Sequence, residues 1–409
     1  MALALPAHHA CTRLTAPGHA GSHTFVSSKP TFGPVSTAAA GSIALSLAGS
    51  SRRYGQQRKV SRRASAVPER WKPFPAEMSS PSGQKLVWLM KENPGLVEDA
   101  LETELDRLSQ EQQQAAELEE SQKGQTTSDA LVLSQRKAEI LAKERSQAVA
   151  ELMYLTVCMR LQALGAPPVK PLKEGGWVSL GAVNLKSLTT DIYSLDALDM
   201  VKEHLFQAVL TQGQPGMPVE IDSAAYGAQV AQVGLFVGAQ MYAMSVLFGY
   251  FLRRVDKRFQ LEKMMSSMSI PDLDEEPDGS SKTLKQYIEG FDPERLQQEG
   301  LLTGEAQMAT SAQVQALFGD LKLLQGQVAE VLGPPDPLAT QEDLGRKIEE
   351  ALKMGKLPSM KIAISDMRRL VLEAVAFGAL LKDSESGVEA ASFQLTEGKV
   401  MEGFAPPEQ

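Results

Sequence analysis

A run of 30 residues without a charged side chain, Ser223–Leu252, constrains the fold of this chain more than any other feature. Arg253 and Arg254 follow it directly. Gly234 and Gly238 lie within it at a spacing that is typical of closely packed helices. By its length the run is either a membrane span or a helix buried on all sides in a soluble protein.

Three properties of the run favour the buried helix. It contains Gln229, Gln232 and Gln240, whose amides are costly in lipid without partners. It is rich in Ala and Gly rather than in Leu and Ile. The helical pattern also continues past the arginines, and the whole helix would be roughly 65 Å long at 1.5 Å per residue. We therefore predict a central buried helix over Ser223–Met268, with integral membrane insertion as the disfavoured alternative.

Apolar side chains recur at three- and four-residue spacing through much of the remaining chain, which predicts amphipathic helices. One long helix is predicted over Asp129–Leu164. A second begins after an N-cap at Ser194 and ends at Leu210, and a last helix begins at Ser365. Only Lys361–Ile364 has the composition of a brief strand. We predict a mainly α fold, a single helical-bundle domain around the long central helix, with at most a minimal strand.

The first 66 residues differ in composition from the rest. The first acidic residue of the chain is Glu69, and six basic residues cluster in Arg52–Arg63. A leader that is free of acids and rich in Ser and Ala is typical of organelle transit peptides. Because Met1–Ala10 is uncharged, a chloroplast is favoured over a mitochondrion. We predict a transit peptide over residues 1–66 with cleavage near Ala66; a disordered cytosolic tail is the alternative.

The charge that remains after this leader limits the classes of partner. The leader holds eight of the 41 basic residues and none of the 50 acidic ones, so the rest has a net charge of −17. Such a surface repels nucleic-acid phosphates, and we expect no nucleic-acid partner. Outside the leader, His204 and Cys158 are single residues of their types. This excludes a disulfide or a Cys–His zinc site within that part, and we expect no cofactor and no metal.

The domain boundaries follow from composition. We expect one helical domain over residues 82–385. An acidic insertion rich in Pro and Gly is predicted to be flexible over residues 269–283. Residues 386–409 are predicted to be a disordered tail.

One charged cluster stands out on this acidic chain. Arg253 and Lys257 share a helix face, as do Arg254 and Arg258, because each pair is four residues apart. Arginine side chains in such a group could bind an anionic ligand or the carboxylates of a partner. The alternative is an internal salt-bridge seam with acidic helices. The candidate binding residues are Tyr250, Arg253, Arg254, Asp256, Lys257, Arg258, Gln260 and, from a second cluster, Arg368 and Arg369.

Four blocks of sequence carry a resemblance to a known family. The longest is Met241–Lys263, which reads MYAMSVLFGYFLRRVDKRFQLEK, and the others are Arg136–Ile140, Phe291–Gln297 and Met367–Gly378. In their order along the chain they resemble the UV-B-induced chloroplastic proteins of plants and algae, which carry the domain of unknown function 760. The resemblance covers roughly residues 82–385. It implies a chloroplast-targeted helical protein whose biochemical role is unassigned, and it supplies no catalytic residues.

Three functions follow as hypotheses. The leading one is a non-enzymatic interaction or regulatory protein of the chloroplast stroma, acting in the light or UV-B stress response. Its protein partner or anionic ligand would dock on the arginine cluster. The second is a thylakoid membrane-associated protein that uses the uncharged segment 223–252. The third is an enzyme or binder that acts on a small anionic metabolite through carboxylates and arginines.

Overall fold

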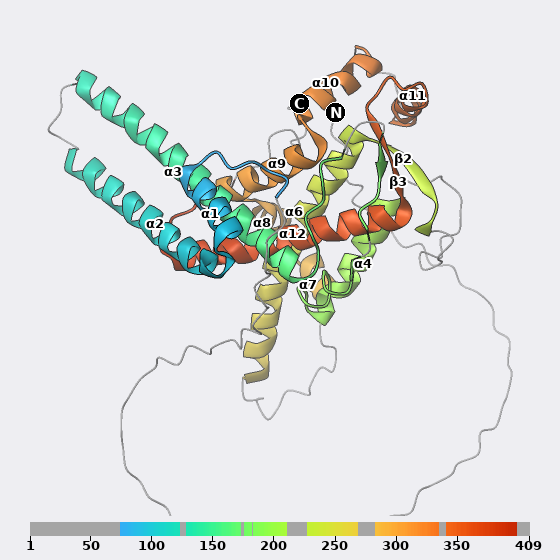
Figure 1. Cartoon of the computed structure of the whole chain (residues 1–409). Coiled ribbons are helices and arrows are strands. Elements are labelled where there is room, and N and C mark those ends of the chain that lie inside the picture. Colours follow the sequence, from blue (N-terminus) through green and yellow to red (C-terminus); the bar gives the residue numbers. More distant parts are fainter. Residues whose placement is uncertain are drawn as a thin grey trace, which may run out of the picture. The chain divides into compact units, whose positions relative to one another are not determined.

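Two strand–helix pairs, in each of which a long helix directly follows a strand, form the centre of the fold. Strand β2 (Val230–Gly234) leads into α6 (Leu235–Met268), and β3 (Ser359–Ala363) leads into α12 (Ile364–Ala390). The two strands pair antiparallel, so the helices leave opposite ends of the ladder. Figure 1 shows α12 crossing α6, and these two helices share the most extensive contact between any elements described.

The computed structural model describes residues 74–122, 128–172, 176–181, 183–210, 227–268, 283–334 and 341–398. All of them belong to one unit of the chain, Ser65–Phe404. The predicted transit peptide (1–66) lies outside the described residues, as does the predicted acidic insertion apart from Thr283.

A three-stranded sheet completes the centre. Its order is β1-β3-β2, and β1 (Trp177–Val178) pairs parallel to β3. In the middle strand, Met360 and Ile362 are fully buried, whereas Lys361 between them is exposed. This alternation is expected because successive side chains of a strand point to opposite faces.

The remaining helices pack around α6 and α12. Helices α3 and α9 contact each other, and both also contact α12. Figure 1 shows α2 and α3 running side by side. These elements are α1 (Pro81–Glu92), the 3₁₀ turn η1 (Pro94–Leu96), α2 (Val97–Gln122), α3 (Ser128–Ala163), α4 (Leu195–Leu210), α7 (Leu284–Glu289), α8 (Pro293–Gly300), α9 (Gly304–Phe318), α10 (Leu321–Leu332) and α11 (Gln341–Lys353).

Helix α8 matters most for the site, and its start is fixed by local chemistry. The side chain of Asp292 accepts a hydrogen bond from the backbone N–H of Arg295 at 3.0 Å. Pro293 occupies the first helical position, where its missing N–H removes no helical bond. The cap and the proline together set where α8 begins.

The long helix α6 lies in the core of the bundle. Tyr242, Val246 and Leu252 are fully buried. By length and hydropathy alone, Leu235–Met265 could cross a membrane, although 56% of its most apolar window is buried inside the fold. A core helix of a soluble protein gives the same signal.

The mainly α prediction is confirmed, and the predicted strand corresponds to β3. The central helix, however, begins at Leu235 and not at Ser223, because residues 230–234 form β2. A charge-free run does not by itself distinguish a helix from a strand, and β2 is only half-buried, with Val230 exposed and Val233 buried. The strands β1 and β2 were not predicted.

The prediction of a disordered tail is wrong for residues 386–398. Helix α12 continues to Ala390, and Phe393 is 3% exposed. The backbone N–H and hydroxyl of Thr396 donate to the buried carboxylate of Glu305, at 2.9 and 2.8 Å. These contacts hold the segment against α9. Residues 399–409 lie outside the described part of the chain.

Candidate functional site

Two acidic side chains from other helices hold the charged cluster of α6. Asp383 comes from α12, and Glu299 comes from α8. Each carboxylate is paired with two cations of α6. The exposed fraction of the side chain is 15% for Asp383 and 5% for Glu299. The cluster is therefore divided into two ion-pair centres.

The Asp383 centre joins α6, α12 and the segment before α4. The Nε and Nη2 atoms of Arg253 donate to the two carboxylate oxygens, both at 2.9 Å, and its Nη1 donates to the carbonyl of Ile192 at 2.5 Å. Lys257 Nζ lies 2.6 Å from Asp383 Oδ1. Burial alone would raise the pKa of Asp383, but the hydrogen bonds and charges of these two cations lower it. We interpret Arg253 as a structural residue.

The Glu299 centre is more open. Arg254 Nε lies 2.8 Å from Glu299 Oε2, and Arg258 Nη1 contacts Oε1. The two arginine side chains are 34% and 44% exposed. Arg254 Nη1 also donates to the carbonyl of Gln298 at 3.2 Å. Each guanidinium has five N–H donors, so this carbonyl and the single carboxylate cannot satisfy both groups. Donors therefore remain available on this face of α6.

These donors border an open depression of about 360 Å³ between α6 and α8. A third guanidinium, that of Arg295, also lines this depression. It stacks on Phe291, with its central carbon 3.9 Å from the ring centroid. Its Nη2 also donates to the hydroxyl of Tyr287 at 3.2 Å. The depression is lined by Arg254, Arg258, Asp292, Glu294, Arg295, Gln298 and Glu299.

Sequence reasoning missed Arg295 and Glu299 as site residues. Both belong to α8, and helix α7 lies between α6 and α8 in the sequence. One signal could have found Arg295, because it lies in Phe291–Gln297, a block on which the family resemblance rests. A charged residue in such a block, close to an aromatic one, is a candidate for a binding surface.

Three predicted site residues have structural contacts instead. Tyr250 is 1% exposed, and its hydroxyl donates to Glu385 Oε2 at 2.7 Å. Asp256 is 2% exposed and accepts a hydrogen bond from Ser194 Oγ at 2.6 Å, next to the start of α4. Gln260 donates to the same carboxylate at 3.3 Å. None of the three lines the depression.

The second predicted cluster does not join the first. Arg369 is 4% exposed, and its guanidinium donates to the carbonyl oxygens of Gly181 at 2.9 Å and of Pro167 at 3.3 Å. It thereby anchors the loop before α4 to α12. Arg368 lies beside it in α12, and neither arginine lines the α6–α8 depression.

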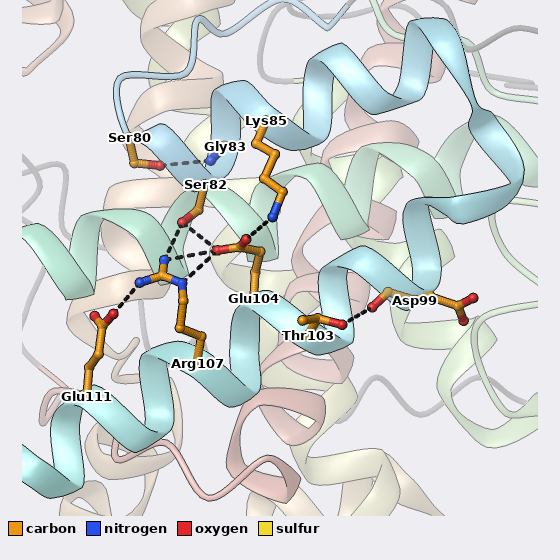
Figure 2. Close-up of polar contacts among 9 residues, drawn as sticks. All are labelled: Ser80, Ser82, Gly83, Lys85, Asp99, Thr103, Glu104, Arg107 and Glu111. Atoms are coloured by element: carbon orange, nitrogen blue, oxygen red, sulfur yellow. Dashed lines mark hydrogen bonds and ion pairs between the residues drawn. The ribbon is translucent and has the colours of Figure 1, made fainter.

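Another polar network joins α1 to α2, as Figure 2 shows. The carboxylate of Glu104 accepts hydrogen bonds from Lys85 Nζ at 2.6 Å, Ser82 Oγ at 3.0 Å and Arg107 Nη2 at 2.9 Å. Burial opposes ionisation of Glu104, but these donors outweigh it and lower the pKa. The contacts all lie within one pair of neighbouring helices, so we interpret the network as structural.

Cys158 is buried, and His204 is half-buried. Burial raises the pKa of the Cys158 thiol to about 12 and lowers that of His204 to about 4. His204 stacks on Phe248 with the ring centroids 4.1 Å apart, and its Nε2 lies 3.0 Å from Ser245 Oγ. At neutral pH the thiol is therefore protonated, which is not the nucleophilic form.

The fold and the site define a mainly α protein with a small sheet and an open, arginine-bordered depression beside its central helix. Residues 101–265 match the family model described as "Protein of unknown function (DUF760)". Over 351 residues the chain is 29% identical to a UV-B-induced, chloroplastic protein of Arabidopsis thaliana. This match covers 77% of the present chain and 76% of the Arabidopsis protein. Together these two findings support an assignment to the DUF760 family, through residues 101–265 of this chain. No solved structure matches it.

Proposed function

We propose that this chain is a chloroplast interaction protein of the light or UV-B stress response. In this proposal it binds an acidic segment of a partner protein at the α6–α8 depression. The chloroplast assignment is supported by the acid-free leader and by the chloroplastic Arabidopsis relative. The link to UV-B is supported by that relative's name.

One observation supports the docking site most strongly. Arg254 and Arg258 share the single buried carboxylate of Glu299 and are still about one-third and two-fifths exposed. Arg295 adds a guanidinium that Tyr287 and Phe291 hold in place. Guanidinium forks suit carboxylates because they can donate two parallel hydrogen bonds. Asp292, Glu294 and Glu299 also line the depression, so it is the exposed guanidinium groups, and not the whole lining, that fit the carboxylates of a partner.

The structure also determines which variant tests the proposal. Arg253→Glu is unsuitable, because Arg253 pairs with Asp383 and its loss would destabilise the fold. The double variant Arg258→Gln/Arg295→Gln leaves Arg254 on Glu299 and keeps amide donors in place. Arg346→Gln is the matched control, since Arg346 is a 70% exposed arginine on α11.

The experiment is native purification of the tagged chain from chloroplasts, followed by identification of the proteins that elute with it. We expect the wild type and Arg346→Gln to retain a stoichiometric partner that Arg258→Gln/Arg295→Gln loses while its circular dichroism is unchanged. Retention of the partner by the double variant would contradict the proposed site. Elution of the wild type without any other protein would contradict the interaction role, and a thermal-shift screen of anionic chloroplast metabolites would then test the third hypothesis.

The thylakoid alternative keeps one supporting observation, the apolar length of Leu235–Met265. Against it, this helix packs on α12, α9 and α4 inside the bundle. We expect the protein to be released from chloroplast membranes by an alkaline carbonate wash. Retention in the membrane pellet would favour the alternative.

A further inference from the structure

The outer halves of α2 and α3 carry exposed large apolar side chains, which are Leu118 on α2 and Val132, Leu133, Ile140 and Leu141 on α3. We call residues 110–122 and 132–147 the α2–α3 arm. On α3, the exposed fraction is 73% for Leu133, 55% for Ile140 and 41% for Leu141. Directly beyond the arm, the same helix is buried, with Ala148 5% exposed and Leu152 1% exposed. The pair of helices thus changes from core to surface along its length.

The exposed face of α3 has a regular pattern. Leu133, Lys137, Ile140 and Glu144 follow one another at spacings of four, three and four residues, so they share one face of the helix. Lys137 and Glu144 are both exposed, and no ion pair involves either of them within the described part of the chain. The face therefore offers leucine and isoleucine side chains together with one charge of each sign.

This pattern is complementary to itself under a two-fold axis. If two α3 helices meet antiparallel with the axis between Ile140 and Leu141, Lys137 of each copy lies opposite the partner's Glu144. The isoleucine and leucine meet in the centre, because a two-fold interface repeats every contact in both directions. We propose that the α2–α3 arm is a self-association surface and that its occupant is a second copy of this chain.

The size of the surface is compatible with this role. The described α3 face is roughly 24 Å long, and two helices together are roughly 20 Å wide. Two such faces bury about 1,000 Å² in total, which is near the lower limit for a specific interface. The dimer is accordingly expected to be reversible in the micromolar range.

The test is sedimentation velocity of the full chain at several concentrations. The wild type is expected to approach twice the 44.2 kDa chain mass. Lys137→Glu places like charges opposite each other, and it should raise the dissociation constant of the dimer about tenfold or more. The charge swap Lys137→Glu/Glu144→Lys should restore dimerisation, because the two-fold pairs are then of opposite sign again.

Ile140→Glu should also give a monomer, and Leu323→Glu is the control. Leu323 is 61% exposed on α10, outside the arm, so its variant should dimerise like the wild type. Circular dichroism establishes that each variant is folded. A monomeric wild type at high concentration, a dimeric Lys137→Glu variant, or a charge swap that stays monomeric would each overturn the proposal. The measurement does not involve the α6–α8 depression, so its outcome is independent of the proposed function.

Discussion

Gly249 on α6 and Gly378 on α12 form a reciprocal backbone contact where the two central helices cross. A Cβ atom added to Gly249 would overlap the carbonyl oxygen of Val375, and one added to Gly378 would overlap that of Val246. In both cases the obstacle is backbone, which cannot rotate away as a side chain can. The closest approach of α6 and α12 thus depends on the absence of two side chains.

We predict that Gly249→Ala and Gly378→Ala each lower the free energy of unfolding by ~3 kcal/mol or more. This is the upper end of the range for overpacking, because backbone must shift. The measurement is urea denaturation followed by circular dichroism. Gly326→Ala on α10 is the control, since nothing lies within 4 Å of its added Cβ, and it should stabilise by up to ~1 kcal/mol. Wild-type stability of both crossing variants would contradict the close approach.

The Asp383 centre should contribute to stability and not to binding. Asp383→Asn leaves Arg253 and Lys257 without their shared counter-charge and should cost ~2–3 kcal/mol, somewhat less than a fully buried pair because Arg253 is 22% exposed. Thermal and urea unfolding give the value. Partner retention should be unchanged in the folded variant; loss of the partner together with wild-type stability would reverse this assignment.

The core carboxylate of Glu373 predicts an unusual pH dependence. Burial raises its pKa to about 7, although the nearby Arg369 opposes the shift. A group whose pKa is raised in the folded state stabilises the fold below its unfolded pKa, and this contribution is lost as the pH rises to about 7. We expect Glu373→Gln to match the wild type near pH 4.5 and to exceed its stability at pH 8, by ~3 kcal/mol at most.

Glu104 provides the comparison of opposite sign, because its pKa is lowered in the folded state. Its contribution is present above the unfolded pKa and is lost as the pH falls through the folded pKa. Glu104→Gln should therefore weaken the fold at pH 7 and lose its effect in acid. Urea unfolding at pH 4.5, 7 and 8 measures Glu373→Gln, and Glu104→Gln is measured in addition below pH 4.5, where its effect should disappear. Parallel pH profiles for Glu373→Gln and the wild type would rule out the raised pKa.

The sequence predicted helices best where apolar spacing and end signals agreed. Asp129–Leu164 differs from α3 by one residue at each end, and Ser194 does precede α4. The helix prediction failed over β2 (Val230–Gly234), because a charge-free run does not distinguish a helix from a strand, and this strand is only half-buried. The Gly249–Gly378 contact could not be predicted, because the two glycines are 129 positions apart and no local sequence pattern indicates that they meet.

The candidate site could be predicted only in part, and the reason is similar. Spacing within one helix correctly placed Arg254 and Arg258 on one face. It could not separate them from Arg253, because that distinction depends on Asp383 and Glu299, which come from distant helices. Ion-pair partners are set by tertiary contacts, and a single sequence contains no pattern that identifies them.

The most direct test of the central claim is the affinity of the α6–α8 depression for carboxylates. We would measure fluorescence anisotropy of a labelled Glu-rich peptide with the wild type, Arg258→Gln/Arg295→Gln and Arg346→Gln. The account predicts saturable binding to the wild type and the Arg346 control, and at least ~tenfold weaker binding to the double variant, because charge-assisted hydrogen bonds are lost. Equal affinity of all three proteins, or no binding to the wild type, would contradict it.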